Sequence, residues 1–226
     1  MGKNKLAQFA ENKTFSHMFE PHMEEVKSNA FKLKGNWNKT FFKNENPLVI
    51  ELGCGKGEYT VNQAKNNPHK NYIGIDIKGA RMWRGAKTVQ EEQIANVAFL
   101  RTRIEFIASF FAENEVDEIW LTFSDPQPKK PNKRLISPYY IAIYKKILSG
   151  KGSIHIKTDS RLFVNTALQQ IKEHQFTIHH CAFDIYGRDW ANFSKEEQEV
   201  LAIKTYYETM WLKKQFPINY LSFSLH

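Results

Sequence analysis

The chain has 226 residues, of which 42% are hydrophobic and 14% aromatic, and this composition excludes a disordered chain and a disulfide-stapled miniature fold. The formal net charge of +8 favours an anionic partner, although a solvated basic surface would give the same charge. Two cysteines and the lack of an apolar run of membrane-spanning length predict a cytoplasmic protein.

The pattern along the chain predicts two parts. Residues 1–45 are polar and rich in Asn and Lys, so we expect a basic, partly flexible extension with one or two short helices. Over residues 46–226, short apolar runs alternate with helical patterns, which is typical of a doubly wound α/β domain with a mostly parallel sheet. The seven expected strands cover residues 47–52, 71–76, 96–100, 116–123, 153–157, 176–185 and 218–223. The expected helices cover residues 58–67, 79–95, 104–113, 138–148 and 159–173, with a last one from Ser194 past Leu201.

A glycine-rich motif follows the first expected strand: residues 51–57, Glu-Leu-Gly-Cys-Gly-Lys-Gly. Glycine permits positive φ and lets a ligand approach the backbone, and ligands of open α/β sheets bind at the carboxyl ends of the strands. The spacing departs from the dinucleotide fingerprint because Glu58 takes the place of the third glycine, where a carboxylate would face a pyrophosphate. A ligand without phosphates, with a cationic group for Glu51, fits better. Asp76 ends the second strand, where its carboxylate can accept hydrogen bonds from two ribose hydroxyls.

The fourth expected strand runs into Ser124-Asp125-Pro126, and a lysine-rich stretch starts at Lys129. Proline restricts the residue before it, so the carboxylate of Asp125 is held in place at the strand end. An acid fixed at a strand end, with a basic loop beyond it, suits a nucleobase on a phosphate backbone. Two segments, 78–87 and 129–134, each carry four basic residues and no acid, and their placement in the fold decides whether they bind a partner.

These motifs resemble those of the bacterial tRNA (guanine-N7-)-methyltransferases, a family of class I methyltransferases. The resemblance extends from about residue 48 to residue 223. It rests on residues 51–57, 72–76, 123–130, 154–159 and 205–208. It implies a Rossmann-like fold, S-adenosyl-L-methionine as the cofactor, and methyl transfer to N7 of a guanine in the variable loop of tRNA.

The resemblance also implies roles for particular residues. The implied cofactor contacts are Glu51, Gly53, Gly55, Asp76, Arg103 and Asp125. The implied substrate contacts are Lys129, Lys133, Arg134, Asp159, Thr205 and Glu208. Asp125 is the implied catalytic residue. Two positions depart from the family pattern: Gln127 stands where the family has Trp, and Arg103 stands where the family has an acid or amide near the adenine.

The chemistry of guanine N7 agrees with this set of residues. N7 carries a free lone pair and no proton, so its attack on a sulfonium methyl group needs no general base, and catalysis is mostly alignment and charge stabilisation. Asp125 can hold the guanine edge, and Asp159 can accept from N1–H and the exocyclic amine. We expect no metal, because the histidines show no ligand spacing. We expect a monomer or a homodimer.

Three alternatives stay open. The first is a non-catalytic RNA-binding protein on the same fold, against which the intact Glu51 motif and Asp125 argue. The second is an amino methyltransferase acting on DNA adenine or protein glutamine, which would have an aromatic residue where Gln127 stands. The third is a nicotinamide oxidoreductase, which the glycine spacing disfavours.

Overall fold

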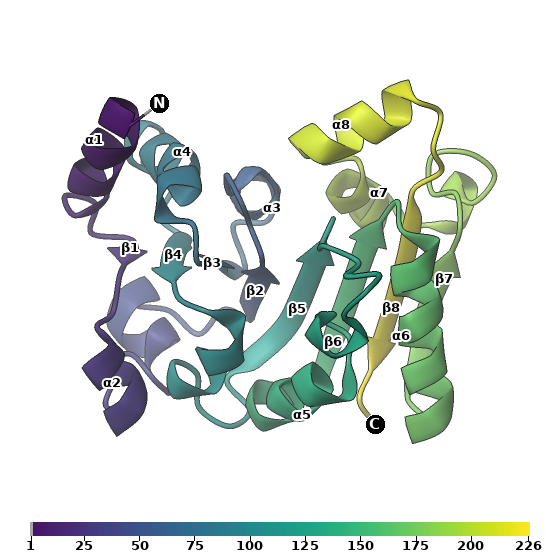
Figure 1. Cartoon of the computed structure of the whole chain (residues 1–226), viewed down its shortest axis with the longest axis horizontal. Coiled ribbons are helices and arrows are strands. Elements are labelled where there is room, and N and C mark those ends of the chain that lie inside the picture. Colours follow the sequence, from purple (N-terminus) through teal and green to yellow (C-terminus); the bar gives the residue numbers. More distant parts are fainter. Residues whose placement is uncertain (1) are drawn as a thin grey trace.

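The computed structural model describes residues 2–226, with their side chains from residue 4 onward. Its centre is one sheet of eight strands in the order β1-β4-β3-β2-β5-β6-β8-β7 (Figure 1). The strands are β1 (Met18–Phe19), β2 (Leu48–Leu52), β3 (Asn71–Asp76), β4 (Val97–Arg101), β5 (Val116–Thr122), β6 (Leu148–Thr158), β7 (Thr177–Ala182) and β8 (Asn219–Ser224). β8 runs antiparallel to β6 and β7, and the other neighbours are parallel. The predicted fold class is confirmed.

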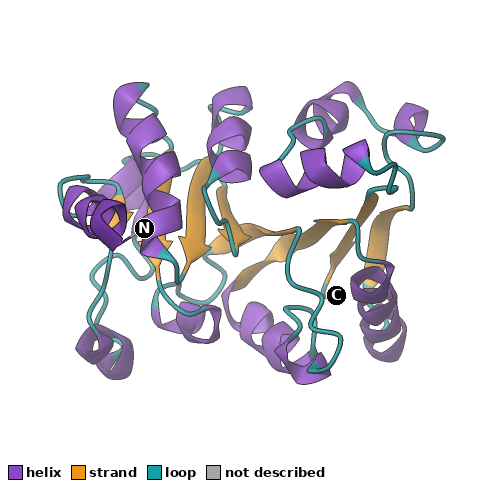
Figure 2. Ribbon diagram, turned by 45° about the horizontal axis from the view of Figure 1, so that its top comes forward, coloured by secondary structure: helices purple, strands orange, loops and turns teal. Residues whose placement is uncertain are grey.

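Helices cover both faces of the sheet (Figure 2). The α-helices are α1 (Gly2–Asn12), α2 (Met23–Ser28), α3 (Glu58–Asn66), α4 (Gly79–Glu91), α5 (Pro138–Ile147), α6 (Arg161–His174), α7 (Lys195–Leu201) and α8 (Tyr206–Lys213). Shorter segments are the π-helix η1 (Trp37–Phe42) and the 3-10 helices η2 (Ile104–Ser109), η3 (Pro131–Lys133) and η4 (Trp190–Asn192). Residues of α3, α4 and α7 share one apolar core with the sheet, and residues of η1, η2, α5 and α6 share the other.

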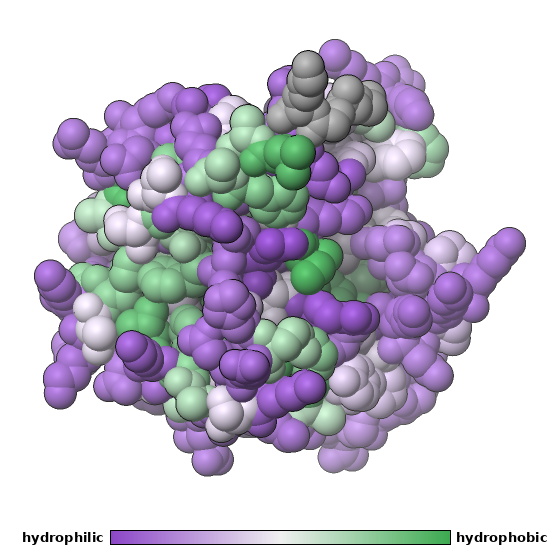
Figure 3. All heavy atoms as spheres, turned by 60° about the vertical axis from the view of Figure 1, so that its left-hand side comes forward, coloured by the Kyte–Doolittle hydropathy of each residue, from purple (hydrophilic) through white to green (hydrophobic). Residues whose placement is uncertain are grey.

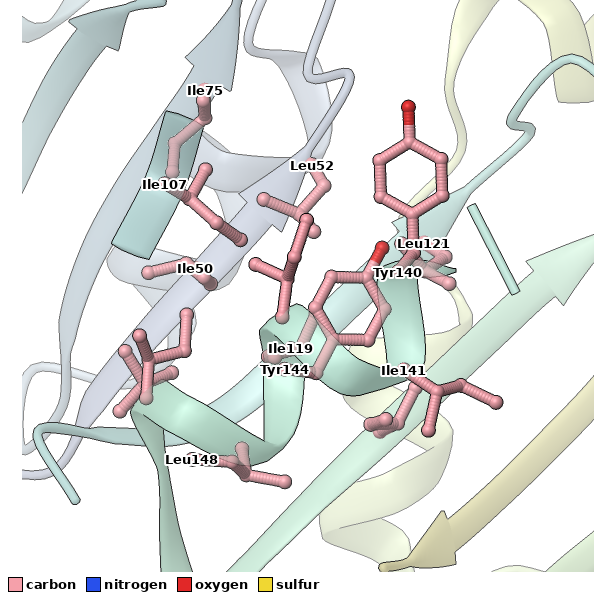
Figure 4. Close-up of a cluster of buried hydrophobic side chains, with 14 of the residues drawn as sticks. Ile50, Leu52, Ile75, Ile107, Ile119, Leu121, Tyr140, Ile141, Tyr144 and Leu148 are labelled. Atoms are coloured by element: carbon pink, nitrogen blue, oxygen red, sulfur yellow. The ribbon is translucent and has the colours of Figure 1, made fainter. Parts of the chain in front are cut away.

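The central strands are buried on both faces, as their continuous apolar runs predict. Successive side chains of a strand point to opposite faces, so Ile50 and Leu52 belong to one core and Val49 to the other. Figure 4 shows Tyr140 and Tyr144 projecting from α5 among the isoleucine and leucine side chains of the core that contains Ile50 and Leu52. Burying one such aliphatic side chain contributes about 1.5–3 kcal/mol to folding.

The segment before β2 packs against the sheet. β1 pairs with β4 through Met18 and Phe99, which makes eight strands where the sequence predicts seven. A two-residue strand is too short to leave an alternating pattern in the sequence. Trp37 is fully buried, and its indole Nε1 donates to the carbonyl of Phe110 at 2.9 Å. The division of the chain at residue 46 stays a prediction, and residue 1 of the proposed extension lies outside the described residues.

Two element boundaries differ from the expectation for identifiable reasons. The predicted helix over 104–113 is the shorter 3-10 helix η2; Ile107 within it and Phe110, the residue that caps its C-terminus, are both buried. A spacing of three residues eclipses on a 3-10 helix, so this form directs both side chains into the core. β6 starts at Leu148 rather than 153, because the chain enters the strand directly after α5. Within residues 2–226, no helix is long and apolar enough to cross a membrane.

Candidate functional site

The glycine motif forms the turn between β2 and α3, at the carboxyl edge of the sheet. The backbone N–H groups of Gly53 and Cys54 both donate to the carbonyl of Ile75, at 2.8 and 3.1 Å, which ties the turn to the end of β3. Gly53 and Gly55 have φ of +81° and +58°, and a Cβ atom at either position would meet no atom within 4 Å. The backbone at these two glycines is therefore open to a ligand.

Glu51 lies beneath this turn with 4% of its surface exposed. Its Oε2 accepts hydrogen bonds from the backbone N–H of Thr60 at 2.9 Å and from the Thr60 hydroxyl, and its Oε1 accepts from the hydroxyl of Thr122. Burial raises the pKa of Glu51 to about 7, against the opposing effect of these hydrogen bonds. A cationic group beside the turn would favour the ionised carboxylate.

Asp76 ends β3 and organises the loops on either side of it. Its Oδ2 accepts from the N–H of Gly55 at 3.0 Å, and its Oδ1 accepts from the N–H of Lys78 at 2.8 Å. A cavity of about 340 Å³ opens beside it, within the size range of small-molecule sites. Its lining includes three residues of the predicted cofactor set: Gly53, Asp76 and Arg103.

Glu58, which occupies the place of the third glycine in the dinucleotide fingerprint, anchors a distant segment. Its Oε2 accepts from the backbone N–H of Tyr206 at 2.9 Å, at the start of α8. The ammonium group of Lys56 lies 5.0 Å from the centre of the Tyr206 ring. These contacts hold the insertion between β7 and β8 against the glycine turn. The negative charge of Glu58 also suits the N-terminus of a helix.

Asp125 is exposed at the end of β5, where the backbone leaves the strand through Phe123 at a positive φ of 48°. Gln127 fixes its carboxylate: the backbone N–H of Gln127 donates to Oδ1 at 2.9 Å, and its side-chain amide donates to Oδ2 at 2.8 Å. Ser124 directly precedes Asp125, and its hydroxyl is buried and has no hydrogen-bond partner within residues 2–226. A bound ligand could supply that partner.

In the basic loop after Asp125, the lysine side chains are exposed and the arginine side chain is buried. Lys129, Lys130 and Lys133 are exposed, and none of the ion pairs in the described part of the chain includes them. Arg134 is 9% exposed. Its Nε donates to the carbonyl of Pro126 at 2.8 Å, and another guanidinium nitrogen donates to the Thr166 hydroxyl at 3.1 Å. Arg134 therefore braces the loop from inside rather than facing a partner.

Thr205 and Glu208 are also turned inward. The Thr205 hydroxyl accepts from the N–H of Glu208 at 3.1 Å, which caps α8. The Glu208 carboxylate pairs with Lys157 of β6, with Nζ 2.8 Å from Oε1, and accepts from the Tyr186 hydroxyl at 2.6 Å. Neither side chain of the ion pair is exposed, so Glu208 does not reach the surface of the site. Asp159 follows β6 and is partly buried, and burial raises its pKa.

Comparison with known proteins identifies the family. Residues 45–219 match the family described as "Putative methyltransferase". The chain is similar to the tRNA (guanine-N(7)-)-methyltransferase of Bacteroides fragilis, with 48% identity over 225 residues that cover 100% of this chain and 87% of that protein. It is 47% identical to the enzyme of the same name from Christiangramia forsetii, over 99% of this chain and 98% of that protein. The chain belongs to the tRNA (guanine-N(7)-)-methyltransferase family. The predicted family is confirmed.

Structures of lower sequence identity show the methyltransferase fold. The 16S rRNA methyltransferase KamB superposes with a TM-score of 0.61 at 13% identity, over 82% of this chain and 90% of that one. A geranyl diphosphate methyltransferase superposes with a TM-score of 0.52 at 12% identity, over 80% of this chain and 72% of that one. This likeness concerns the fold and carries no argument about the substrate.

Three residues of this family member have roles around the site that the sequence did not predict: Glu58, Gln127 and Lys157. Of the three, only Lys157 could have been recognised from the sequence. It is a lysine at a buried position of an apolar strand, and a buried charge requires a buried partner.

The predicted metal-free site stays a prediction. Within the described residues, no group of three or more His, Cys, Asp or Glu side chains could hold a metal ion.

Proposed function

We propose that this protein transfers the methyl group of S-adenosylmethionine to N7 of a guanine in tRNA, in the variable loop. The observation that carries the proposal is the exposed carboxylate of Asp125, held at the same sheet edge as the glycine turn and followed by exposed lysines. The family gives the reaction class, since relatives at 46–48% identity carry the name tRNA (guanine-N(7)-)-methyltransferase.

The residues around the glycine turn fit this cofactor. When bound, S-adenosylmethionine supplies an electrophilic methyl group on a sulfonium ion. Gly53 and Gly55 leave the backbone open on the ligand side, and Asp76 borders a cavity of suitable size with a carboxylate for the ribose hydroxyls. Glu51 provides a buried negative charge under the turn. A donor without phosphates is favoured because the carboxylates of Glu51 and Glu58 would repel a pyrophosphate there.

Asp125 and Asp159 are proposed to recognise the guanine. Attack by N7 develops positive charge on the purine, and a carboxylate fixed in place before the reaction stabilises that charge without reorganisation. Asp125 is held by two hydrogen bonds from Gln127, which meets this requirement. Asp159 follows the neighbouring strand β6, and its carboxylate can accept from N1–H and the exocyclic amine, which adenine cannot satisfy together.

The RNA backbone is proposed to contact two basic surfaces. The first is the loop with Lys129 and Lys133. The second is the exposed face of α4 with Arg81 and Arg84, together with Lys78, the residue directly before this helix. β5 and β3 flank β2 in the sheet, so these surfaces lie on opposite sides of the glycine turn. Figure 3 shows the side of the molecule that lies on the left in Figure 1, where hydrophilic side chains alternate with smaller apolar patches, and a largely polar face of this kind agrees with a wet interface to RNA.

The decisive experiment is a methyl-transfer assay on bulk tRNA that lacks 7-methylguanosine, followed by nucleoside analysis. The wild type should form 7-methylguanosine, and Asp125→Ala should lose most turnover while it keeps tRNA affinity. Product at an exocyclic amine would favour the amino methyltransferase, and tRNA binding without any methylated product would favour the non-catalytic RNA-binding protein. Stabilisation by NADH but not by S-adenosylmethionine would favour an oxidoreductase. The cytoplasmic location and the monomeric or dimeric state stay predictions.

A further inference from the structure

The cavity beside Asp76 contains a second carboxylate, Glu105, which the predicted cofactor residues do not include. β4 ends at Arg101 and η2 starts at Ile104, so the chain turns at the cavity rim, and Glu105 lies in the first turn of η2. Among the described residues that line the cavity, Asp76 and Glu105 carry the carboxylates. Each of them can therefore serve a different part of a nucleoside.

The surroundings of Glu105 leave its carboxylate able to accept hydrogen bonds. A guanidinium nitrogen of Arg103 lies 3.6 Å from Oε1, which is longer than a hydrogen bond, and the side chains of Arg103 and Glu105 are 62% and 34% exposed. Burial, and then the Glu105 carboxylate, raise the pKa of Tyr140 to about 12, which agrees with a position of the Tyr140 hydroxyl near Glu105. Tyr140 and Glu105 both line the cavity.

The two carboxylates differ in what they can reach. Asp76 is tied at both oxygens to backbone N–H groups of the glycine turn and of Lys78, which keeps it at the ribose end of the cavity. The base must then lie towards the start of η2. The amino group at position 6 of adenine is a donor, and a carboxylate accepts while a guanidinium only donates. The guanidinium of Arg103 thus cannot accept from this amino group, whereas the carboxylate of Glu105 can.

We propose that Glu105 accepts a hydrogen bond from the 6-amino group of the cofactor's adenine and so selects an adenine nucleoside. The proposal rests on the proposed function, because it takes S-adenosylmethionine as the ligand of this cavity. Arg103 is a neighbour of Glu105 in this arrangement and makes no contact on which the selection depends.

The test compares two ligands by isothermal titration calorimetry: S-adenosylhomocysteine, and its analogue in which hydrogen replaces the 6-amino group. The wild type should bind S-adenosylhomocysteine about tenfold or more tightly than the analogue, as expected for a hydrogen bond to a charged group. Glu105→Ala should bind the two ligands within about threefold of each other. Glu91→Ala, which removes an exposed carboxylate of α4 outside the lining of the cavity, is the charge-matched control and should keep the wild-type preference.

The outcomes separate this inference from the proposed function. If Glu105→Ala keeps the wild-type preference for the amino group, or if the wild type has none, Glu105 is not the acceptor. If the wild type binds neither ligand, the cofactor assignment itself fails. Thermal unfolding of Glu105→Ala without ligand checks the fold, and a midpoint near that of the wild type is expected because Glu105 is partly exposed.

Discussion

Gln127 holds Asp125 with two hydrogen bonds, one from its backbone N–H and one from its side-chain amide. The side-chain bond comes from an amide that the Trp of the family pattern lacks, so Gln127 gives this chain its own means of orienting the carboxylate. Gln127→Ala should lower kcat several-fold with little change in the KM for tRNA, because one of the two orienting bonds is lost while the RNA contacts remain.

Steady-state methylation kinetics check this prediction. Asn132→Ala, in the same loop and exposed, is the control and should behave as the wild type. An unchanged kcat in Gln127→Ala would mean that the backbone bond and Pro126 suffice to hold Asp125.

The buried pair of Lys157 and Glu208 is expected to matter for stability. Lys157 also donates to the carbonyls of Leu201 and Ile203 at 2.7 Å each, so it joins β6 to the end of α7 and the start of α8. Glu208→Ala leaves an uncompensated buried ammonium and should reduce the free energy of unfolding by about 3–5 kcal/mol. Urea unfolding measures this loss.

A surface ion pair provides the comparison. Glu92 pairs with Lys65 at a partly exposed site, and Glu92→Ala should cost less than about 1 kcal/mol. The double variant Lys157→Met with Glu208→Leu should recover part of the loss, since it removes both buried charges. Similar losses in Glu208→Ala and Glu92→Ala would contradict a structural role for the buried pair.

The affinity for S-adenosylmethionine should depend on pH through Glu51. Burial raises its pKa to about 7, so the free protein carries a proton on Glu51 below that pH. A cationic ligand favours the ionised carboxylate, and binding must then release the proton. The affinity should therefore be constant above pH 7 and fall by up to about tenfold per pH unit below it.

Calorimetry at pH 6, 7 and 8 checks this dependence. Glu51→Gln has no proton to release, so its weaker binding should be nearly independent of pH in this range. A wild-type affinity that stays constant from pH 8 to pH 6 would rule out a titrating Glu51 in contact with the cofactor.

His155 should make the stability of the protein depend on pH. Its ring stacks on Trp120 at 4.4 Å and shares hydrogen bonds with Ser153 and the Tyr220 hydroxyl, and burial lowers its pKa to about 4. The unfolded chain takes up the proton near pH 6.5, so the free energy of unfolding should fall as the pH drops from 6.5 to 4, by up to about 3 kcal/mol.

Urea unfolding between pH 4 and pH 7 measures this effect. His155→Phe should be less stable than the wild type at pH 7 but show a shallower decline towards pH 4. His69→Ala, at an exposed histidine, should retain the wild-type slope. Equal slopes in His155→Phe and the wild type would assign the decline to other groups.

The parts of the site that are local in sequence could be predicted, and the parts that depend on distant contacts could not. The glycine turn and Asp76 follow from residue types at strand ends, which a single sequence reveals. The inward orientation of Glu208 depends on Lys157, 51 residues away in sequence, and that of Arg134 on carbonyl groups of a folded loop. The resemblance to the family implied that both residues are substrate contacts, and sequence patterns do not say which charged side chains are already paired.

The two basic surfaces give the last prediction, which concerns RNA docking. Lys129 and Lys133 on the loop, and Arg81 and Arg84 on α4, are exposed and free of ion pairs in the described part of the chain. Each phosphate contact that is lost should reduce the slope of log affinity against log salt by about 0.7–0.9. A double alanine variant at either pair should therefore flatten the slope, and the combination of both should flatten it further, because the two surfaces lie on opposite sides of the glycine turn.

The control for these variants is a pair of lysines with the same charge at a different position in the fold. Lys145 and Lys146 are exposed in the last turn of α5, which leads directly into the start of β6, and they lie at the sheet edge opposite Asp125. Their double alanine variant lowers the net charge as much as the other two but should keep the wild-type salt slope. If all three double variants flatten the slope equally, tRNA responds to net charge alone. If neither the loop variant nor the α4 variant changes the slope, both segments are solvated surfaces and the RNA docks elsewhere.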